Sequence, residues 1–406
     1  MHEFNIWHAL LMIAVVFGAL QATAGFLVYV ERKVCAYMQD RIGPNRVGPY
    51  GLLQVLADGL KFAFKEEFIP RNADKVLFIL APCVAFSTAM LAFAVVPFGA
   101  TEPAPVPPPA IAAGATAEQM DRHAREVAEY QKKAEAYKTS YQFAIAPNID
   151  IGILFIFAIT SLAVYGIILG GWASNNKYSM LGGLRSSAQI ISYEIPLGLS
   201  ILGVILITGS LNLESIIWHQ AEGGLMSWNI FFQPLAFLLF MISSFAECNR
   251  LPFDLPESEQ ELIGGYHTEY NAFKLAFFFI GEYTHMITTS FLMVIMFFGG
   301  WHFPWLASTE AHWLIKLIVF AGKVTCLILF YMLVRWTLPR FRFDQLMGLA
   351  WKVFIPLALV NLVLVMFVKE FNLSLWWLLP ASIATLVGYG MMASLALPSP
   401  RSALRG

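Results

Sequence analysis

Acidic side chains in this chain gather beside long apolar runs, and their setting indicates proton exchange. The densest group lies between Glu247 and Tyr270, in the sequence ECNRLPFDLPESEQELIGGYHTEY. Its carboxylates are Glu247, Asp254, Glu257, Glu259, Glu261 and Glu269, and Arg250 is its arginine. Apolar residues alternate with these acids, which favours acids held against protein, where repulsion and lost water raise carboxylate pKa values. The alternative is a merely solvated acidic loop.

Charged side chains also lie inside the apolar runs, where a charge is tolerated mainly when it faces a cavity or a partner. They are Glu194, in SYEIPLGLS, Glu282 and Lys323. Since an unpaired buried carboxylate neutralises itself most cheaply by binding a proton, Glu194 and Glu282 are predicted to relay protons. His285 stands alone on an apolar helix, and we expect it to be a satisfied core residue.

A third group follows the first apolar run. Glu31 and Arg32 end that run, and DRIGPNRVGPYG then turns the chain tightly and brings Arg41 and Arg46 near the amphipathic stretch 50–66. These arginines either anchor the span by reaching the membrane surface or line a mouth through which a lipid-like molecule enters. Arg185 and Gln189, in GGLRSSAQIISYE, would close another side of such a mouth.

The sequence predicts neither a metal site nor nucleic-acid binding. The cysteines Cys35, Cys83, Cys248 and Cys326 are scattered without a C-x-x-C pair, so neither an iron–sulfur cluster nor a zinc site is predicted. A formal net charge of -1 and a pI near 6.7 give no sign of nucleic-acid binding.

Composition places the chain among polytopic membrane proteins. Of its 406 residues, 58% are hydrophobic and 13% are charged, with a mean hydropathy of +0.64. Because a span needs about 20 mainly apolar residues, the sequence predicts an all-α protein with about nine transmembrane helices. The predicted spans are 6–29, 76–98, 149–171, 188–208, 230–246, 272–299, 313–336, 350–368 and 375–397.

The distribution of Lys and Arg predicts the orientation. Segment 31–75 holds eight of them and 335–342 holds three, whereas 209–229 and 300–312 hold none. By the positive-inside rule, the N-terminus lies outside, while the acidic loop and the C-terminus lie inside. Residues 50–66 are amphipathic at helical spacing and are expected to lie in the inner membrane interface. A short soluble packing helix is the alternative.

The predicted organisation has four parts. Residues 1–100 hold the first two spans, the arginine-rich loop and the amphipathic helix, and 101–146 form an external insert with a proline-rich stalk and an exposed helix. Residues 147–368 hold the remaining core spans with the acidic loop 247–270, and 369–406 form an extra span and tail.

Four long motifs stand in order along the chain. They are ERKVCAYMQDRIGPNRVGPYGLLQVLADGLKFAFKE, GGLRSSAQIISYEIPLG, AECNRLPFDLPESEQELIGGYHTEY and RWTLPRFRFDQLM. Together they closely resemble the H-subunit family of respiratory complex I, the proton-translocating NADH:quinone oxidoreductase, whose members carry much of the quinone chamber. The resemblance runs from residue 1 to about 368. It does not explain the 101–146 insert or the ninth span, since the family ordinarily has eight helices.

The resemblance implies that this chain is a membrane subunit of an enzyme. The chain itself would bind no NADH, flavin or iron–sulfur cluster. Its substrate would be ubiquinone or menaquinone. Its partners would be the peripheral-arm quinone-site subunits, the antiporter-like membrane subunits and the lipid bilayer. The expected location is the bacterial inner membrane, with the mitochondrial inner membrane as the alternative.

The resemblance also assigns residues by matching motif. The expected quinone-binding residues are Glu31, Arg32, Arg41, Arg185, Arg250 and Asp254. The expected proton-coupling residues are Glu194, Glu247, Glu257, Glu259, Glu261, Glu269, Glu282 and Lys323. No catalytic residue and no metal ligand is expected on this chain.

Two other functions stay open on the sequence. The first is the equivalent membrane subunit of an energy-converting hydrogenase, which moves ions without quinone. The second is a free-standing ion or proton antiporter, for which Glu194, Glu282 and Lys323 would suffice. Detection of bound quinone would distinguish the complex I function from the hydrogenase function. Ion transport by the purified chain alone would identify an antiporter.

Overall fold

The computed structural model describes residues 6–103, 105, 108, 117–139, 143–254 and 264–396. Within these ranges the chain is all-α, and its β-structure is a single isolated bridge between Phe303 and Ala307. Glu257, Glu259 and Glu261 lie outside the described residues.

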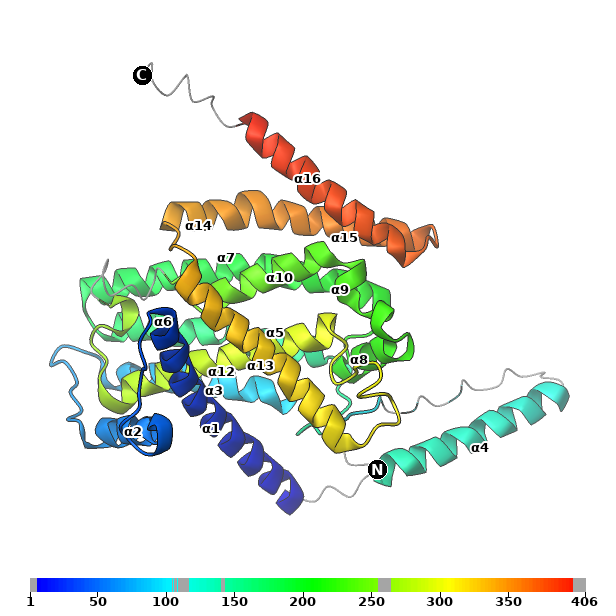
Figure 1. The fold of residues 1–406 in the computed structure, drawn as a ribbon, viewed down its shortest axis with the longest axis horizontal. Helices are drawn as coiled ribbons and strands as arrows, with labels where there is room; N and C mark the ends of the chain where they lie inside the picture. The colour runs from blue at the N-terminus through cyan, green and yellow to red at the C-terminus, as the bar shows by residue number, and fades with distance from the viewer. Residues whose placement is uncertain are drawn as a thin grey trace.

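Long apolar helices make up the bundle in Figure 1. In chain order they are α1 (Ile6–Met38), α3 (Lys75–Leu91), α5 with α6 (Gly152–Ser161 and Ala163–Ala173), α7 (Lys177–Thr208), α12 (Ala272–Phe297), α13 (Trp313–Thr337), α14 with α15 (Phe343–Leu349 and Ile355–Glu370) and α16 (Leu378–Ala396). In the described part of the chain, these give eight spans by length and composition. The predicted span 230–246 corresponds to a shorter apolar helix, α10 (Pro234–Glu247), which follows α9 (Asn229–Phe232). The prediction of an all-α polytopic membrane protein is confirmed.

Helix α7 begins at Lys177, before the predicted start of its span at residue 188. Asn176 caps it, because its side-chain oxygen accepts a hydrogen bond from Tyr178 N at 2.9 Å. The stretch of glycine and serine that follows is too polar to resemble a span, yet Gly182 and Ser186 are buried in the bundle. Small residues of this kind let neighbouring backbones approach closely.

Gly182 shows how close that approach is. A Cβ at this position would lie 2.6 Å from the carbonyl carbon of Gly265, in the short helix η4 (Gly265–His267). The same holds for Gly166 of α6, whose Cβ would lie 2.8 Å from the backbone nitrogen of Ala85 in α3. Glycine therefore fixes the segment before α12 against α7, and α3 against α6.

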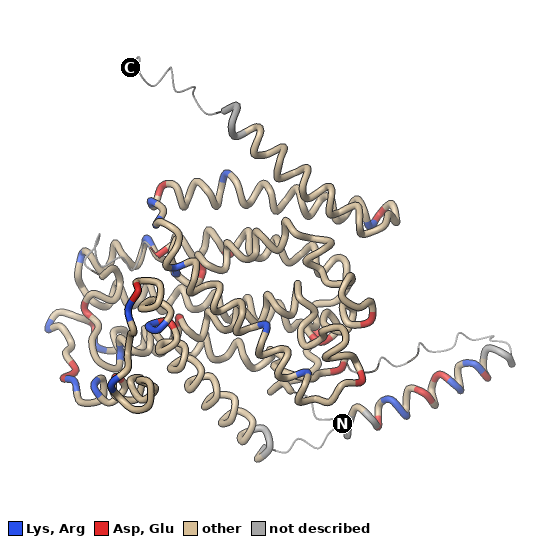
Figure 2. Tube along the Cα trace, in the orientation of Figure 1, with Lys and Arg blue, Asp and Glu red and all other residues tan. Residues whose placement is uncertain are grey.

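Basic side chains gather at one end of the bundle, which Figure 2 shows and which we call the α2 end. There α2 (Gln54–Phe64) packs against α1 and α12. Every residue of α2 is at least partly exposed, and Leu56, Leu60 and Phe64 expose large apolar side chains. The helix expected within 50–66 is thus present, and its exposed apolar face suits a membrane interface.

The insert contains α4 (Ala117–Thr139), which extends away from the bundle in Figure 1. Two ion pairs at i,i+4 spacing support it, Arg125 with Asp121 at 2.8 Å and Lys133 with Glu129 at 2.7 Å. After the insert the chain returns to the bundle, where Ala146 N donates to the carbonyl oxygen of Ala94 at 2.9 Å.

The opposite end, which we call the α8 end after α8 (Leu213–Glu222), holds a buried carboxylate, Glu214. The backbone N–H of Asn148 donates to its Oε1 at 3.1 Å, and its Oε2 is buried with no hydrogen-bond partner among the described residues. Burial raises the pKa of Glu214 to about 7, although the hydrogen bond from Asn148 opposes this shift.

We expect Gly182→Ala to destabilise the assembled protein by about 1–3 kcal/mol, because the added methyl group overlaps the Gly265 backbone. The matched control is Gly198→Ala in the same helix, where a Cβ would meet nothing within 4 Å. The measurement is the thermal unfolding midpoint in detergent. An equal midpoint for the two variants would contradict the close packing of α7 on η4.

The raised pKa of Glu214 predicts that its contribution to stability falls as pH rises. The folded state holds this proton up to about pH 7, whereas the unfolded chain releases it near 4.5. Stability is therefore lost between these values, by roughly 3 kcal/mol at about 1.4 kcal/mol per pKa unit. Glu214→Gln should flatten the fall in unfolding midpoint from pH 5 to pH 8, while Glu222→Gln, at the exposed end of α8, should preserve it.

Candidate functional site

A cavity of about 870 Å³ opens at the α2 end, between α1, α2, α12 and the loop after α10. Its wall is apolar along the helices, for example at Val28, Phe62 and Ile280. Its charged groups are Glu31, Arg32, Arg41, Asp58, Arg250, Asp254, Glu282 and Arg335. An apolar pocket of several hundred Å³ with a few placed charges is the usual form of a site for a small ligand.

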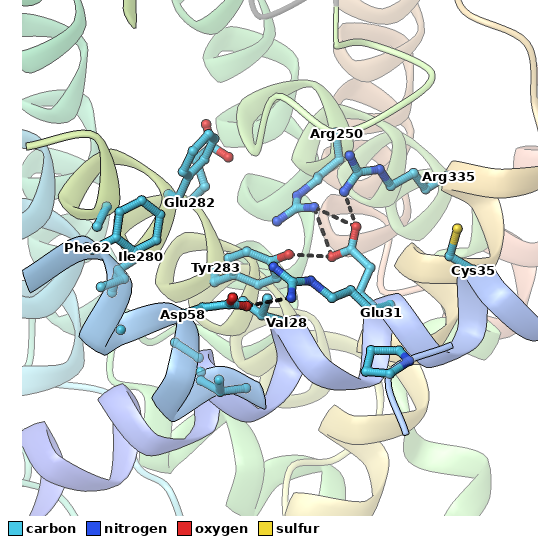
Figure 3. Close-up of a pocket in the computed structure, with 18 of the residues that line it drawn as sticks. Val28, Glu31, Cys35, Asp58, Phe62, Arg250, Ile280, Glu282, Tyr283 and Arg335 are labelled. Carbon is cyan, nitrogen blue, oxygen red and sulfur yellow. Dashed lines mark hydrogen bonds and ion pairs between the residues drawn. The ribbon is translucent and has the colours of Figure 1, made fainter. Parts of the chain in front are cut away.

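Glu31 of α1 is the centre of the charged cluster (Figure 3). Arg250 Nη1 donates to both its carboxylate oxygens at 3.2 Å, and Tyr283 Oη donates to Oε2 at 2.7 Å. Arg335 of α13 forms a second ion pair with Oε1. The Glu31 side chain is 7% exposed. One carboxylate thus joins α1, α12, α13 and the acidic loop.

Two arginines face this single carboxylate, and Glu282 adds a second negative charge near Arg250. Arg250 is 8% exposed in its side chain, and its guanidinium carbon lies 4.4 Å from the ring centre of Tyr283. Burial alone would lower the pKa of Arg250, but Glu31, Tyr283 and Glu282 together outweigh it and raise that pKa. Arg250 therefore stays charged and attracts anionic or electron-rich groups in the cavity.

A second ion pair joins α1 to α2. Arg32 Nη1 lies 2.5 Å from Asp58 Oδ2, and Gln54 Nε2 donates to Asp58 Oδ1 at 3.1 Å. The Arg32 side chain is 46% exposed. Since a guanidinium has five N–H donors, Arg32 has others to offer a ligand. Arg41 also lines the cavity and donates to Gln39.

The first part of the acidic loop is held in place by Gln189 of α7. This fully buried side chain donates through Nε2 to the carbonyl oxygens of Ala246 and Phe253, each at 2.8 Å. Asp254 then forms an ion pair with Arg340 at 3.4 Å. These contacts fix Arg250 and Asp254 at the cavity wall.

Glu282 and Asn249 line a second, smaller cavity as well as the first. The second cavity measures about 60 Å³ and also borders Glu247, Cys248 and His285. Figure 3 shows the Glu282 side chain pointing away from the Glu31 carboxylate. Glu282 is thus a carboxyl group placed between two cavities.

The remaining predicted residues lie elsewhere. Arg185 stacks on Phe343, its guanidinium carbon 5.2 Å from the ring centre, and Glu269 Oε1 accepts a hydrogen bond from Asn176 at 2.6 Å. Glu194 accepts a hydrogen bond from Ser161. Lys323 Nζ donates to three carbonyl oxygens just beyond the end of α12, those of Phe298, Gly300 and His302, at 2.6–2.9 Å. The proposed roles of these four residues stay predictions.

Sequence reasoning missed Asp58, Tyr283 and Arg335 as parts of the cluster, and it interpreted His285 as a core residue. The signal for Asp58 was present, because an acid on the amphipathic helix is the nearest available partner for Arg32. Nothing local marks Arg335, whose partner lies 304 residues away. In the described ranges, no group of three or more His, Cys, Asp or Glu side chains is arranged to hold a metal ion.

Comparison with known proteins gives consistent matches. Residues 10–366 match a family model described as NADH dehydrogenase. The chain is 44% identical over 358 residues to NADH-quinone oxidoreductase H subunit 1 of Cytophaga hutchinsonii, covering 87% of this chain and 94% of that protein. It is 45% identical over 350 residues to NADH-quinone oxidoreductase H subunit 1 of Geobacter metallireducens, covering 86% and 93%. It is 45% identical over 347 residues to the NADH-quinone oxidoreductase H subunit of Leptospira biflexa, covering 84% and 89%.

We expect Glu31→Gln to be far more destabilising than Arg32→Gln. Without the carboxylate, Arg250 is a buried charge facing Arg335, and breaking such a buried pair costs about 3–5 kcal/mol. The exposed pair of Arg32 with Asp58 contributes about 1 kcal/mol or less. Unfolding midpoints of the two variants in detergent measure the difference, and similar midpoints would show that Glu31 is not the structural centre of the cluster.

Proposed function

The chain belongs to the H-subunit family of NADH-quinone oxidoreductase, whose members are membrane subunits of respiratory complex I, and on that basis we propose that its 870 Å³ cavity binds quinone. It is therefore a subunit of an enzyme complex and works with the other subunits of that complex. The observation that carries the proposal is the cluster of Glu31 with two arginines in the wall of a cavity that shares Glu282 with a second, inner cavity.

The chemistry of the cavity suits a quinone. Quinones combine an apolar prenyl tail with a ring whose two carbonyl oxygens accept hydrogen bonds. The apolar wall of α1 and α12 can hold the tail, while Arg32 and Arg41 offer donors to the ring as it enters. Neither the hydrogenase subunit nor the free-standing antiporter is favoured by a specific observation.

Quinone reduction would act on the cluster through charge. Conversion to the quinol takes two electrons and two protons, and negative charge builds on the ring oxygens whenever electrons arrive before protons. In a cavity of low dielectric this charge is weakly screened. The guanidinium groups of Arg250 and Arg335 stabilise it, and nearby acids bind protons more readily.

Coupling would then run through Glu282 into the second cavity, toward Glu247 and on to Glu194. Electrostatic interaction between Glu194 and Glu247 supports the last step. We propose that Glu257, Glu259 and Glu261, which follow Asp254 in the chain, respond first to the charge on the quinone. The family assignment makes this response one step in a larger proton-translocating assembly.

We place the α2 end on the cytoplasmic side of a bacterial inner membrane. The basic residues at this end favour that side by the positive-inside rule, and the named relatives are bacterial. In this orientation the peripheral-arm subunits dock over α2 and the acidic loop. Antiporter-like membrane subunits would flank the bundle within the bilayer.

Filling the cavity tests its role. Val28→Trp puts a large side chain into the wall, so we expect the KM for a short-chain quinone to rise about tenfold or more, equal to about 1.4 kcal/mol of lost binding. NADH oxidation with a water-soluble artificial acceptor should be unchanged. Val15→Trp is the matched control, because Val15 lies on the same helix, is 57% exposed and is absent from the residues lining the cavity. Wild-type quinone kinetics in Val28→Trp would refute quinone binding here.

A further inference from the structure

The second cavity has features of a proton-transfer site. Its volume of about 60 Å³ leaves room for roughly two water molecules. Polar groups reach it from separate parts of the chain, Glu282 and His285 from α12, and Glu247 with Asn249 from the end of α10 and the loop that follows. Apolar side chains of α3 and α6, including Ala85 and Ile167, complete the lining. Water confined by an apolar wall and two carboxyl groups is suited to moving protons between them.

His285 lines this cavity with both carboxyl groups and contacts one of them directly. Its Nε2 is 3.1 Å from Glu247 Oε1, and the side chains of His285 and Glu247 are 13% and 6% exposed. Glu282 precedes it by three residues on α12 and so projects from the same face of the helix. The other oxygen of Glu247, Oε2, is buried and makes no hydrogen bond within the described part of the chain.

We propose that His285 transfers protons between Glu282 and Glu247 across this cavity. A proton released by Glu282 binds to one ring nitrogen, and the ring then releases the proton on its other nitrogen to Glu247. The imidazole ends neutral, Glu282 ends ionised and Glu247 ends protonated. The contact with Glu247 persists in both states, because an imidazole N–H donates to a carboxylate and a carboxyl O–H donates to an imidazole nitrogen. Histidine suits this exchange because each ring nitrogen can either carry a proton or accept one.

The other titratable groups around His285 are compatible with this role. Glu194 of α7 interacts electrostatically with both Glu247 and His285. Burial raises the pKa of Cys248 to about 12, so that its thiol keeps its proton at neutral pH. The hydroxyl group of Tyr331, on α13, lies 3.4 Å from Thr289 Oγ1 of α12. Tyr266 of η4 lines the cavity. Glu194 is thus a third carboxyl group near the pair, and Glu247 is the one in direct contact with His285.

The inference rests on the proposed function, and it is tested in the assembled complex in membrane vesicles. His285→Gln keeps an amide N–H for Glu247 but cannot bind a proton near neutral pH. We expect kcat for quinone reduction per assembled complex to fall about tenfold or more, with the quinone KM unchanged. Assembly is measured by NADH oxidation with a water-soluble acceptor.

A second variant and a control separate proton transfer from packing. His285→Asn, whose shorter side chain also loses the contact with Glu247, should show the same loss as His285→Gln. A defect in His285→Asn alone would mean that only the hydrogen bond matters and would overturn the inference. So would a raised quinone KM, or normal kcat and normal proton movement per NADH in His285→Gln. His219→Gln, on the exposed side of α8, should behave as the wild type.

The two proposals fail in different ways. Normal kinetics in His285→Gln beside a raised quinone KM in Val28→Trp would remove His285 from proton transfer and leave the quinone cavity in place. Normal quinone kinetics in Val28→Trp would remove the cavity and with it the basis for the relay.

Discussion

The pairing of Glu31 with Arg250 and Arg335 is the interaction on which the α2 end depends. It is made between α1, α13 and the acidic loop, and Tyr283 adds α12 through its hydroxyl group. Buried ion pairs of this kind add little net stability, because the loss of water offsets the attraction, yet they are costly to break. The cluster therefore serves mainly to specify one arrangement of these elements. That arrangement is also what shapes the cavity.

The position of Glu282 follows from the same arrangement. Tyr283 is turned toward Glu31, so the preceding residue on α12 points away from the cluster, as Figure 3 shows. Two successive residues of α12 thus face different regions: Tyr283 contacts the charged cluster, and Glu282 lines the second cavity. A small rotation of α12 would alter both at once, which is a physical basis for linking events in one cavity to protonation in the other.

Apolar runs predicted the long spans, and the motif around Glu31 and Arg32 supplied charged groups that line the cavity, since both are local patterns. The start of α7 was predicted too late. Its first residues are rich in glycine and serine, which lowers their hydropathy, yet several of them are buried in the bundle. Lys323 was expected to be a proton-coupling residue, but its contacts with carbonyl oxygens depend on the turn after α12, where Gly299 and Gly300 have positive φ. Pairings such as Glu31 with Arg335 join residues 304 positions apart, and no local pattern encodes them.

That separation has a consequence for biogenesis. Helix α1 leaves the ribosome first and carries a carboxylate whose partners are synthesised 219 and 304 residues later. At roughly 5–20 residues per second, Glu31 waits on the order of 15 to 60 s for Arg335. During that delay Glu31 has to be solvated by other groups, because its two ion-pair partners do not yet exist. The last contact of the first helix is therefore made only after most of the chain has been synthesised.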